Sequence, residues 1–321
     1  DNNETDTLAR IRNMGIPVTL GQKAENINGA EMIVYTAALL PDNPELVAAK
    51  ASGIPTFERA ELLGAVTRMY DDCYCVCGTH GKTTVSSMLT QIMIQCGKDP
   101  SDVIGGKLPL TQSNGRVGKT QNMVCEACEF KDTFLRLSPD VAIILNVDAD
   151  HLEYFKTIEN IIKSFNKFSK MATKALIVNG DDANSLKAIE GITDKKIITF
   201  GIDKKNEFFA DNIIVDHAFA NYDVFKNGVK LGHIKLKVPG EHNIHNSLAA
   251  LAAADYAGID IKDAISSLEQ FGGACRRFEI LAEIDGITIA DDYAHHPAEL
   301  KVTLDAAMQM DYNNVWAVFQ P

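Results

Sequence analysis

Continuous apolar runs alternate with stretches of helical periodicity along most of the chain. The runs predict strands covered on both faces, because a half-exposed strand would alternate apolar and polar residues. Predicted strands cover Met32–Thr36, Cys73–Cys77, Met123–Ala127, Val141–Val147, Ala175–Asn179, Ile197–Phe200, Ile287–Ala290 and Val315–Phe319. Predicted helices cover Thr83–Cys96, Ile158–Met171, Asn243–Ala257, Ile261–Phe271 and Ala298–Met310. The repeated β-then-α order predicts a doubly wound α/β fold.

The pattern changes at two places, which we predict to be domain boundaries. Near Met69–Asp72 a charged helix end meets a cysteine-rich strand, and near Phe271–Ala274 two glycines end a helix. The predicted domains are residues 1–70, 71–272 and 273–321. Within the middle domain, residues 202–238 change to short alternating segments with an Asn-Gly turn signal, which predicts a β-meander.

Composition and charge narrow the functions that such a fold can serve. The 321 residues are 46% hydrophobic and 23% charged, as in ordinary globular proteins, and the formal net charge is −12. This acidity disfavours binding to nucleic acid or to a membrane surface, because both are anionic. No stretch approaches the ~20 apolar residues that span a bilayer, and the polar opening does not resemble a signal peptide. We expect a cytoplasmic protein, and no feature predicts an obligate protein partner.

The cysteines cluster, with Cys73, Cys75 and Cys77 in alternation and Cys125 and Cys128 in a CxxC spacing. Alternate residues of a strand point to one face, so the first three are predicted to be small buried side chains. A zinc or redox site is the alternative, although no second CxxC or nearby histidine completes a set of four ligands. The pattern favours reduced cysteines in a cytosolic core.

The strongest local signal is the segment Gly78–Thr84, GTHGKTT, between an apolar strand and a helix. Glycines let the backbone wrap a phosphate, and the N–H groups and dipole of the following helix face the anion. Lys82 adds a charge for the outer phosphates, and Thr83 adds a hydroxyl for Mg²⁺. The literal Walker A pattern fails because Val76 replaces its first glycine, so this is a variant form. The alternative is a strand–helix turn with a surface lysine.

The same tripeptide recurs at Gly118-Lys119-Thr120. Here it precedes a predicted strand, whereas a phosphate site needs a helix N-terminus after the loop. We therefore predict a hairpin turn at this second GKT segment.

Three acidic residues and a histidine lie at the ends of the next two predicted strands of the middle domain. Glu126 ends one strand, and Asp148, Asp150 and His151 follow the other. Ligands bind at the carboxyl edge of a parallel sheet, and Mg²⁺ that accompanies ATP takes oxygen ligands there. Taken alone, His151 is better explained as a helix N-terminal residue, and the two aspartates as helix-capping acids.

A pair of asparagines marks the start of a later predicted helix. Asn243 and Asn246 are three residues apart, so they share one helix face, and their amides suit the edge of a purine. Ordinary helix capping is the alternative.

A second polar cluster lies near the end of the chain. Asp292, His295 and His296 gather at a predicted strand–helix turn, and such clustering of ionisable groups is typical of a site. Arg276 and Arg277 lie upstream and suit bidentate contacts to phosphate or carboxylate, with a surface ion pair as the alternative.

Taken in order, these segments resemble the Mur ligase family over essentially the whole chain. The resemblance rests on CGTHGKTT, CEACE, NVDADHLEYF, GEHNIHNSLAA, RRFE, DDYAHHPAEL and VFQP. It implies a central P-loop-type ATPase domain with a parallel sheet, flanked by partial Rossmann-like N- and C-terminal domains. It also implies ATP-dependent ligation of L-alanine to UDP-N-acetylmuramate in peptidoglycan precursor synthesis. A ligase that recycles the murein tripeptide is the nearest alternative, and a nucleotide-binding module without ligase activity is the competing class.

The resemblance further implies roles for individual residues. The ATP site would comprise Gly78, Thr79, His80, Gly81, Lys82, Thr83, Thr84, Asn243, Asn246, Arg277 and Asp292. The catalytic group would comprise Lys82, Glu126, His151, His295 and His296. Mg²⁺ would be held by Thr83, Glu126 and His151. The uridine nucleotide would contact Thr36, Ala37 and Ala38.

Two departures from the family affect these expectations. The family has a strand and a Gly-rich loop for the uridine diphosphate before the point where this chain begins, and its last domain continues past Pro321. We therefore expect impaired UDP-sugar binding, and a strand at Val315–Phe319 without later neighbours. The implied reaction passes through an acyl phosphate and needs domain closure but no catalytic cysteine.

Overall fold

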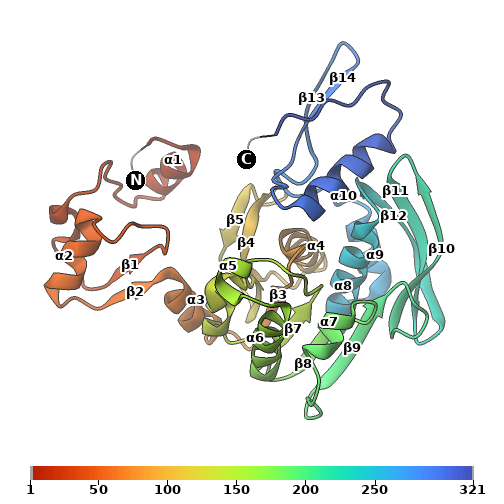
Figure 1. The fold of residues 1–321 in the computed structure, drawn as a ribbon, viewed down its shortest axis with the longest axis horizontal. Helices are drawn as coiled ribbons and strands as arrows, with labels where there is room; N and C mark the ends of the chain where they lie inside the picture. Colours follow the sequence, from red (N-terminus) through yellow and green to blue (C-terminus); the bar gives the residue numbers. More distant parts are fainter. Residues whose placement is uncertain (1–2, 320–321) are drawn as a thin grey trace. The chain divides into compact units, whose positions relative to one another are not determined.

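The computed structural model describes residues 3–319, in two compact units that divide between Val66 and Thr67 (Figure 1). In the first unit, β1 (Ile33–Tyr35) and β2 (Thr56–Glu58) pair in parallel. The strand predicted at Met32–Thr36 is confirmed. The helices of this unit are α1 (Asp6–Asn13), η1 (Ala24–Ile27), α2 (Pro44–Ser52) and α3 (Arg59–Thr67), the last of which ends in the second unit.

The second unit is built on one ten-stranded sheet. Its strands, in spatial order, are β12 (Val229–Pro239), β11 (Phe219–Lys226), β10 (Phe208–Asp216), β9 (Lys196–Gly201), β8 (Ala175–Asn179), β7 (Val141–Ile144), β3 (Asp72–Cys77), β6 (Asn122–Glu126), β4 (Ser101–Leu108) and β5 (Ser113–Arg116). All neighbours from β10 to β4 run parallel, and β5, β11 and β12 are antiparallel to their neighbours. The predicted α/β class with a central, mostly parallel sheet is confirmed.

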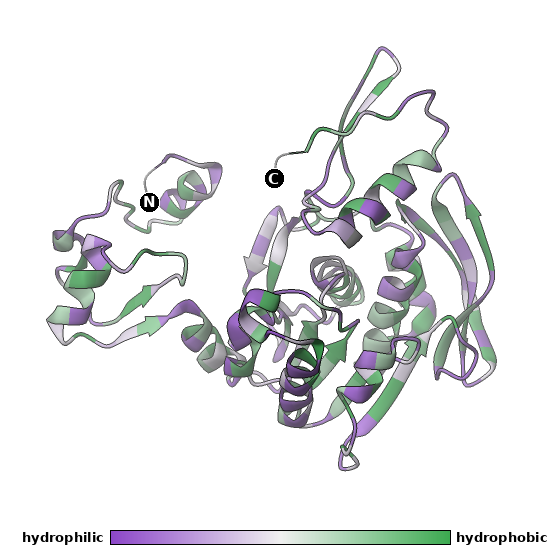
Figure 2. Ribbon diagram, in the orientation of Figure 1, coloured by the Kyte–Doolittle hydropathy of each residue, from purple (hydrophilic) through white to green (hydrophobic). Residues whose placement is uncertain are grey.

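The central strands are buried on both faces, as their continuous apolar runs predict. Every residue of β7 and β8 is buried, and these strands are largely hydrophobic in Figure 2. Cys73, Cys75 and Cys77 are buried in β3, and Cys125 is buried beside them in β6. The expectation of small buried side chains is confirmed for Cys73, Cys75 and Cys77.

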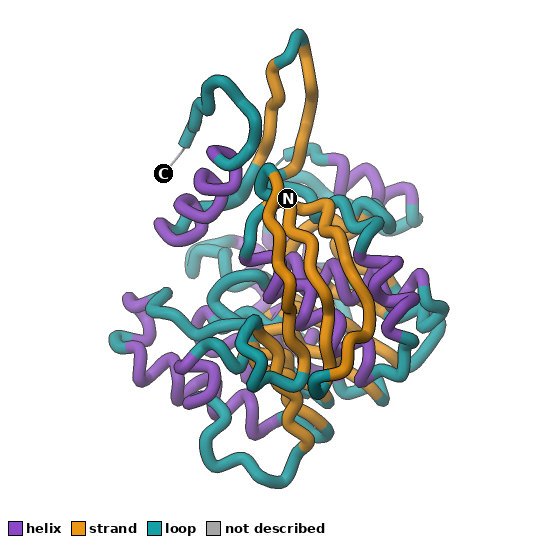
Figure 3. Tube along the Cα trace, turned by 90° about the vertical axis from the view of Figure 1, so that its right-hand side faces the viewer, coloured by secondary structure: helices purple, strands orange, loops and turns teal. Residues whose placement is uncertain are grey.

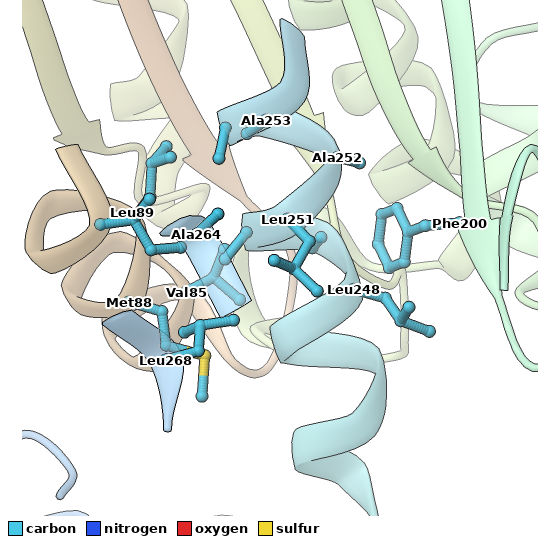
Figure 4. Packing of buried hydrophobic residues seen from close by; sticks show 14 of the residues in the cluster. Val85, Met88, Leu89, Phe200, Leu248, Leu251, Ala252, Ala253, Ala264 and Leu268 are labelled. Carbon is cyan, nitrogen blue, oxygen red and sulfur yellow. The ribbon is translucent and has the colours of Figure 1, made fainter. Parts of the chain in front are cut away.

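Helices cover the sheet. They are α4 (Lys82–Gln95), η2 (Phe130–Arg136), α5 (Leu152–Phe155), α6 (Ile158–Met171), α7 (Ala183–Lys187), α8 (His242–Tyr256), α9 (Ile261–Leu268) and α10 (Pro297–Met308). Of these, α4, α6, α8, α9 and α10 lie close to the five predicted helices, whereas η2, α5 and α7 were not predicted. In the hydrophobic core, Leu89 of α4 packs with Leu251 of α8 and Leu268 of α9 (Figure 4). Because α8 presents a run of alanines at its centre, the helices can approach closely without voids. No helix in the described part of the chain could cross a membrane.

The predicted β-meander is confirmed as β10, β11 and β12. Asn227 and Gly228 both adopt positive φ, 49° and 80°, at the turn between β11 and β12, as a two-residue hairpin turn requires. The meander extends the main sheet, because β10 pairs in parallel with β9.

Beyond Gly273 the chain leaves the sheet. The strands β13 (Glu279–Ile284) and β14 (Ile287–Asp291) form an antiparallel hairpin that projects from the body of this unit (Figure 3). The strand predicted at Val315–Phe319 is wrong. Trp316 is 90% exposed and Val318 is 100% exposed, and none of the three described sheets provides a neighbour to receive the hydrogen bonds that a strand needs.

Candidate active site

The predicted phosphate loop connects β3 to α4, as a strand–loop–helix unit requires. Gly78 has φ 147° and Gly81, at the N-cap of α4, has φ 86°. A Cβ atom at Gly78 would lie 2.9 Å from Leu145 Cβ, and one at Gly81 would lie 2.5 Å from Asn246 Oδ1. Both positions therefore exclude a side chain, and the loop backbone packs directly on its surroundings.

Asn146, which follows β7, fixes the loop from outside. The His80 N–H donates to Asn146 Oδ1 at 2.7 Å, and Asn146 Nδ2 donates to the His80 carbonyl at 3.0 Å. The Thr79 N–H donates to the Asn146 carbonyl at 3.0 Å. Sequence reasoning gave Asn146 no role, although the residue lies in the quoted NVDADH motif.

The Lys82 side chain is only 15% exposed, which argues against the surface-lysine alternative. Its Nζ donates to the carbonyls of Gly78 at 2.6 Å and Thr79 at 3.0 Å, and to Glu129 Oε1 at 3.1 Å. Burial by itself lowers the pKa of Lys82, but the Glu129 carboxylate outweighs this effect and the pKa lies above its ordinary value. The lysine is therefore a charged group held inside the loop.

Two of the three proposed Mg²⁺ ligands lie together. Thr83 Oγ1 donates to Glu126 Oε1 at 3.2 Å, and the Gly105 N–H donates to Glu126 Oε2 at 2.7 Å. A hydroxyl and a carboxylate beside a phosphate loop are oxygen donors of the kind that Mg²⁺ accepts, so these residues fit the ion. Among the described residues, no group of three or more His, Cys, Asp and Glu side chains is arranged to hold a metal.

His151, the third proposed ligand, makes its direct contacts with other residues. It is the N-cap of α5 with φ 53°, as the helix-start alternative predicted. Its ring centroid is 4.8 Å from that of Phe130, and its nitrogens lie 3.7 Å from Asp150 Oδ2 and 3.5 Å from Glu153 Oε1. Among the described residues no direct contact joins His151 to Thr83 or Glu126, and its place at the metal stays a prediction.

A cavity of about 360 Å³ adjoins the phosphate loop and brings together most of the residues expected at ATP. Of those residues, it is lined by His80, Gly81, Thr84, Asn243, Asn246, Arg277 and Asp292. The predicted common face of the asparagines is confirmed, since Asn246 Nδ2 donates to Asn243 Oδ1 at 2.8 Å. His242, which sequence reasoning missed, also lines the cavity, and desolvation by the surrounding protein atoms lowers its pKa to about 4.

Residues from the end of the chain reach the loop through α10. Glu299 Oε1 lies 3.3 Å from His80 Nδ1, and the His296 ring centroid lies 5.5 Å from that of His80. Burial raises the pKa of Glu299, but His80 and other neighbours outweigh it and lower the pKa to about 2. His295 is exposed, with Nδ1 3.6 Å from Glu299 Oε2. Sequence reasoning named the histidines and missed Glu299.

Asp292 holds the turn before α10. Its Oδ2 accepts from the Phe278 N–H at 2.8 Å, and its Oδ1 accepts from the Ala294 N–H at 2.7 Å. In the first unit, Thr36, Ala37 and Ala38 form an exposed turn directly after β1.

The second GKT segment is not a hairpin turn. It connects β5 to β6, which are not neighbours because β4 lies between them. The Gly118 N–H donates to Ser101 Oγ at 2.9 Å, and the Lys119 N–H donates to Asp99 Oδ2 at 3.1 Å. The prediction failed because strand order, which decides hairpin pairing, is not visible in local turn residues.

The phosphate loop lies in a mostly parallel sheet and faces residues from a following segment, and the sequence around it matches models of the Mur ligase family. The Mur ligase middle domain matches residues 76–254. The domain described as "Mur ligase, glutamate ligase domain" matches residues 276–321, and that described as "Mur ligase family, catalytic domain" matches residues 1–71. The chain belongs to the Mur ligase family. Gln320 and Pro321, which end the VFQP motif, lie outside the described residues.

Within the family, the chain is similar to proteins named as UDP-N-acetylmuramate–L-alanine ligases. The chain is 41% identical over 317 residues to a UDP-N-acetylmuramate–L-alanine ligase of Caldanaerobacter subterraneus, covering 98% of this chain and 69% of that protein. It is 42% identical over 325 residues to the ligase of the same name from Agathobacter rectalis, covering 100% and 71%. The crystal structure of a UDP-N-acetylmuramate–alanine ligase of Thermotoga maritima superposes with a TM-score of 0.84 at 30% identity, covering 96% and 71%.

Proposed function

We propose that this protein is an ATP-dependent ligase that joins L-alanine to UDP-N-acetylmuramate, in the cytoplasmic synthesis of peptidoglycan precursors. One observation carries the proposal: a single cavity joins the phosphate loop to Asn243, Asn246, Arg277 and Asp292. The identity of 41–42% to ligases of this name supports the choice of substrates. The proposed domain division is residues 1–70, 71–272 and 273–321.

The proposed reaction has two steps. A carboxylate oxygen of UDP-N-acetylmuramate attacks the γ-phosphorus of ATP, the bond to the bridging oxygen breaks, and ADP leaves. The amine of L-alanine then attacks the acyl phosphate, loses a proton, and phosphate leaves as the amide forms. The N–H groups at the start of α4 bind the phosphates, and Lys82 and Arg277 stabilise their developing charge.

We assign the proposed Mg²⁺ ligands to Thr83, Glu126 and His151. The ion supplies charge neutralisation on the phosphates when it is bound. Thr83 and Glu126 are supported by their mutual contact at 3.2 Å, whereas His151 stands on the family resemblance alone. The catalytic roles of His295 and His296, and uridine contacts by Thr36, Ala37 and Ala38, are likewise proposals from the resemblance.

The experiment measures ADP formation with UDP-N-acetylmuramate, Mg²⁺ and ATP, adding L-alanine, glycine, L-serine or the murein tripeptide in turn. Turnover that depends on the acceptor and favours L-alanine is expected. Preference for the tripeptide would transfer the assignment to the recycling reaction. ATP binding without acceptor-dependent ADP formation would leave a nucleotide-binding module instead.

A further inference from the structure

A buried carboxylate that the reaction above does not use lies against the phosphate-loop lysine. Glu129 is 3% exposed, and its two oxygens lie 3.1 Å and 3.0 Å from Lys82 Nζ. The residue comes 47 positions after Lys82, in the loop that follows β6. A carboxylate this buried needs a partner that offsets its lost hydration, and Lys82 is that partner.

The loop around Glu129 is fastened at several points. The Ala127 N–H donates to the Val76 carbonyl of β3 at 2.8 Å, and the Cys128 carbonyl accepts from the Phe134 N–H at 2.9 Å. Two consecutive non-glycine residues, Lys131 and Asp132, adopt the left-handed conformation, with φ of 51° and 59°. Such backbone persists where its surroundings fix it, and it gathers at functional sites.

The same loop also touches the segment that carries His151. The Phe130 ring packs against the His151 ring, and Asp132 Oδ2 accepts from the Tyr154 hydroxyl at 2.9 Å. Glu129 is thus held between two anchored neighbours, with its carboxylate directed at Lys82.

Lys82 has no spare donor in this arrangement. Its ammonium group has three N–H donors, and three acceptors already take them: the carbonyls of Gly78 and Thr79 and the carboxylate of Glu129. To contact a phosphate, the lysine must give up at least one of these partners. The carboxylate also repels any phosphate that approaches the same ammonium group.

We propose that Glu129 is a positioning residue that holds Lys82 in the nucleotide-free loop and competes with the phosphates of ATP for it. The inference rests on the proposed function, since it takes ATP as the ligand of the loop. Glu129 therefore lowers the affinity for ATP while keeping the lysine charged and ordered in its absence.

The first test is Glu129→Gln, which keeps the shape and one acceptor oxygen but removes the charge. ATP affinity, measured by calorimetry with Mg²⁺ at fixed ionic strength, is expected to rise roughly tenfold, because a like charge near the phosphates is removed. The matched control is Glu159→Gln, an exposed position on α6, for which no change is expected.

The second test removes the positive partner of the pair, alone and together with the negative one. Lys82→Met leaves Glu129 as a buried charge without its partner and is expected to weaken both the fold and ATP binding. The double variant Lys82→Met/Glu129→Gln is expected to regain melting temperature and to bind ATP at least about tenfold more tightly than Lys82→Met. This neutral pair also tests the proposal if Glu129→Gln alone proves unstable.

Unchanged or weaker ATP binding by a folded Glu129→Gln variant would overturn the proposal and leave a purely structural ion pair. A raised Mg²⁺ requirement in that variant would also overturn it, because Glu129 would then be a metal ligand. Failure of the unsubstituted protein to bind ATP would instead refute the proposed function, so the two failures are distinguishable.

Discussion

The chain contains the tripeptide Gly-Lys-Thr twice, and the two copies have opposite structures. At Gly81-Lys82-Thr83 the lysine side chain is only 15% exposed, and the loop opens a helix of 14 residues. At Gly118-Lys119-Thr120 the lysine is exposed, and the amides of the first two residues are already bonded to Ser101 and Asp99. Anion binding thus depends on the elements around the tripeptide, since a helix N-terminus presents unpaired N–H groups, whereas the amides of Gly118 and Lys119 are already bonded.

Each of the two regions contains a buried carboxylate, and the two carboxylates differ in whether they have a partner. Near the first copy, Glu129 is paired with Lys82. Near the second, Asp102 of β4 is 1% exposed and both of its oxygens lack a hydrogen-bond partner among the described residues. Burial raises the pKa of Asp102 to about 6, whereas Arg116 lowers it by less. In the first region the buried carboxylate, Glu129, is paired with a residue of the candidate site. In the second region the buried carboxylate, Asp102, lowers the stability of the fold when it is ionised.

The largest expected effect separates the two lysines. Lys82→Ala should reduce ADP formation by about 10²–10³-fold, because a preorganised cation is lost from the transition state. The rate should fall more than the affinity for UDP-N-acetylmuramate does. Lys119→Ala is the control and should leave the rate unchanged. Near-normal turnover by Lys82→Ala would refute the phosphate-loop assignment.

The next effect concerns stability and pH at Asp102. Its pKa is raised in the fold from an ordinary value of 3.8 to about 6, so its protonated form favours folding. That contribution is complete below about pH 4 and is lost as the pH rises through 6. Asp102→Asn should therefore raise the free energy of unfolding by about 2–3 kcal/mol at pH 8 and change it little at pH 4. Denaturant unfolding at both pH values measures this, and equal effects at both would contradict it.

A smaller effect separates the two glycines. A Cβ at Gly118 would lie 2.2 Å from the Asp99 carbonyl oxygen, so Gly118→Ala should destabilise the fold by about 1–3 kcal/mol without changing the affinity for ATP. At Gly81 the Cβ would displace the Asn246 side chain, so Gly81→Ala should weaken ATP binding as well. Thermal unfolding and calorimetry together separate the two outcomes, and loss of ATP affinity in a folded Gly118→Ala variant would contradict the comparison.

The smallest effect separates the two threonines. Thr120 Oγ1 donates to the Lys98 carbonyl at 2.6 Å, so Thr120→Val should reduce stability by about 1 kcal/mol. Thr83→Val should instead raise the Mg²⁺ concentration needed for half-maximal ADP formation. The same Mg²⁺ titration on both variants is the check, and a shift in Thr120→Val would be unexpected.

Elements with strong local patterns were predictable from the sequence. The bounds of α6 and β8 match the predictions, because a clear helical period and a pure apolar run define them. By contrast, β4 was missed because Asp102 and the pair Gly105-Gly106 interrupt its apolar pattern.

Site residues were predictable where a motif carries them and not where distant contacts create them. Glu129 meets Lys82 from 47 residues away, and Glu299 meets His80 from 219 residues away. No local period or turn rule encodes such pairings, since they arise from strand order and from the placement of α10. The role expected of His151 at the metal stays a prediction, since its described contacts are with Phe130, Asp150 and Glu153.

The most direct test of the proposed ligase chemistry follows an oxygen atom. UDP-N-acetylmuramate labelled with ¹⁸O in its carboxylate is incubated with ATP, Mg²⁺, L-alanine and the protein, and the released phosphate is analysed by mass spectrometry. An acyl phosphate requires one carboxylate oxygen to leave with each phosphate, so we predict one ¹⁸O atom per phosphate released. Phosphate free of ¹⁸O, released as the amide forms, would contradict the account.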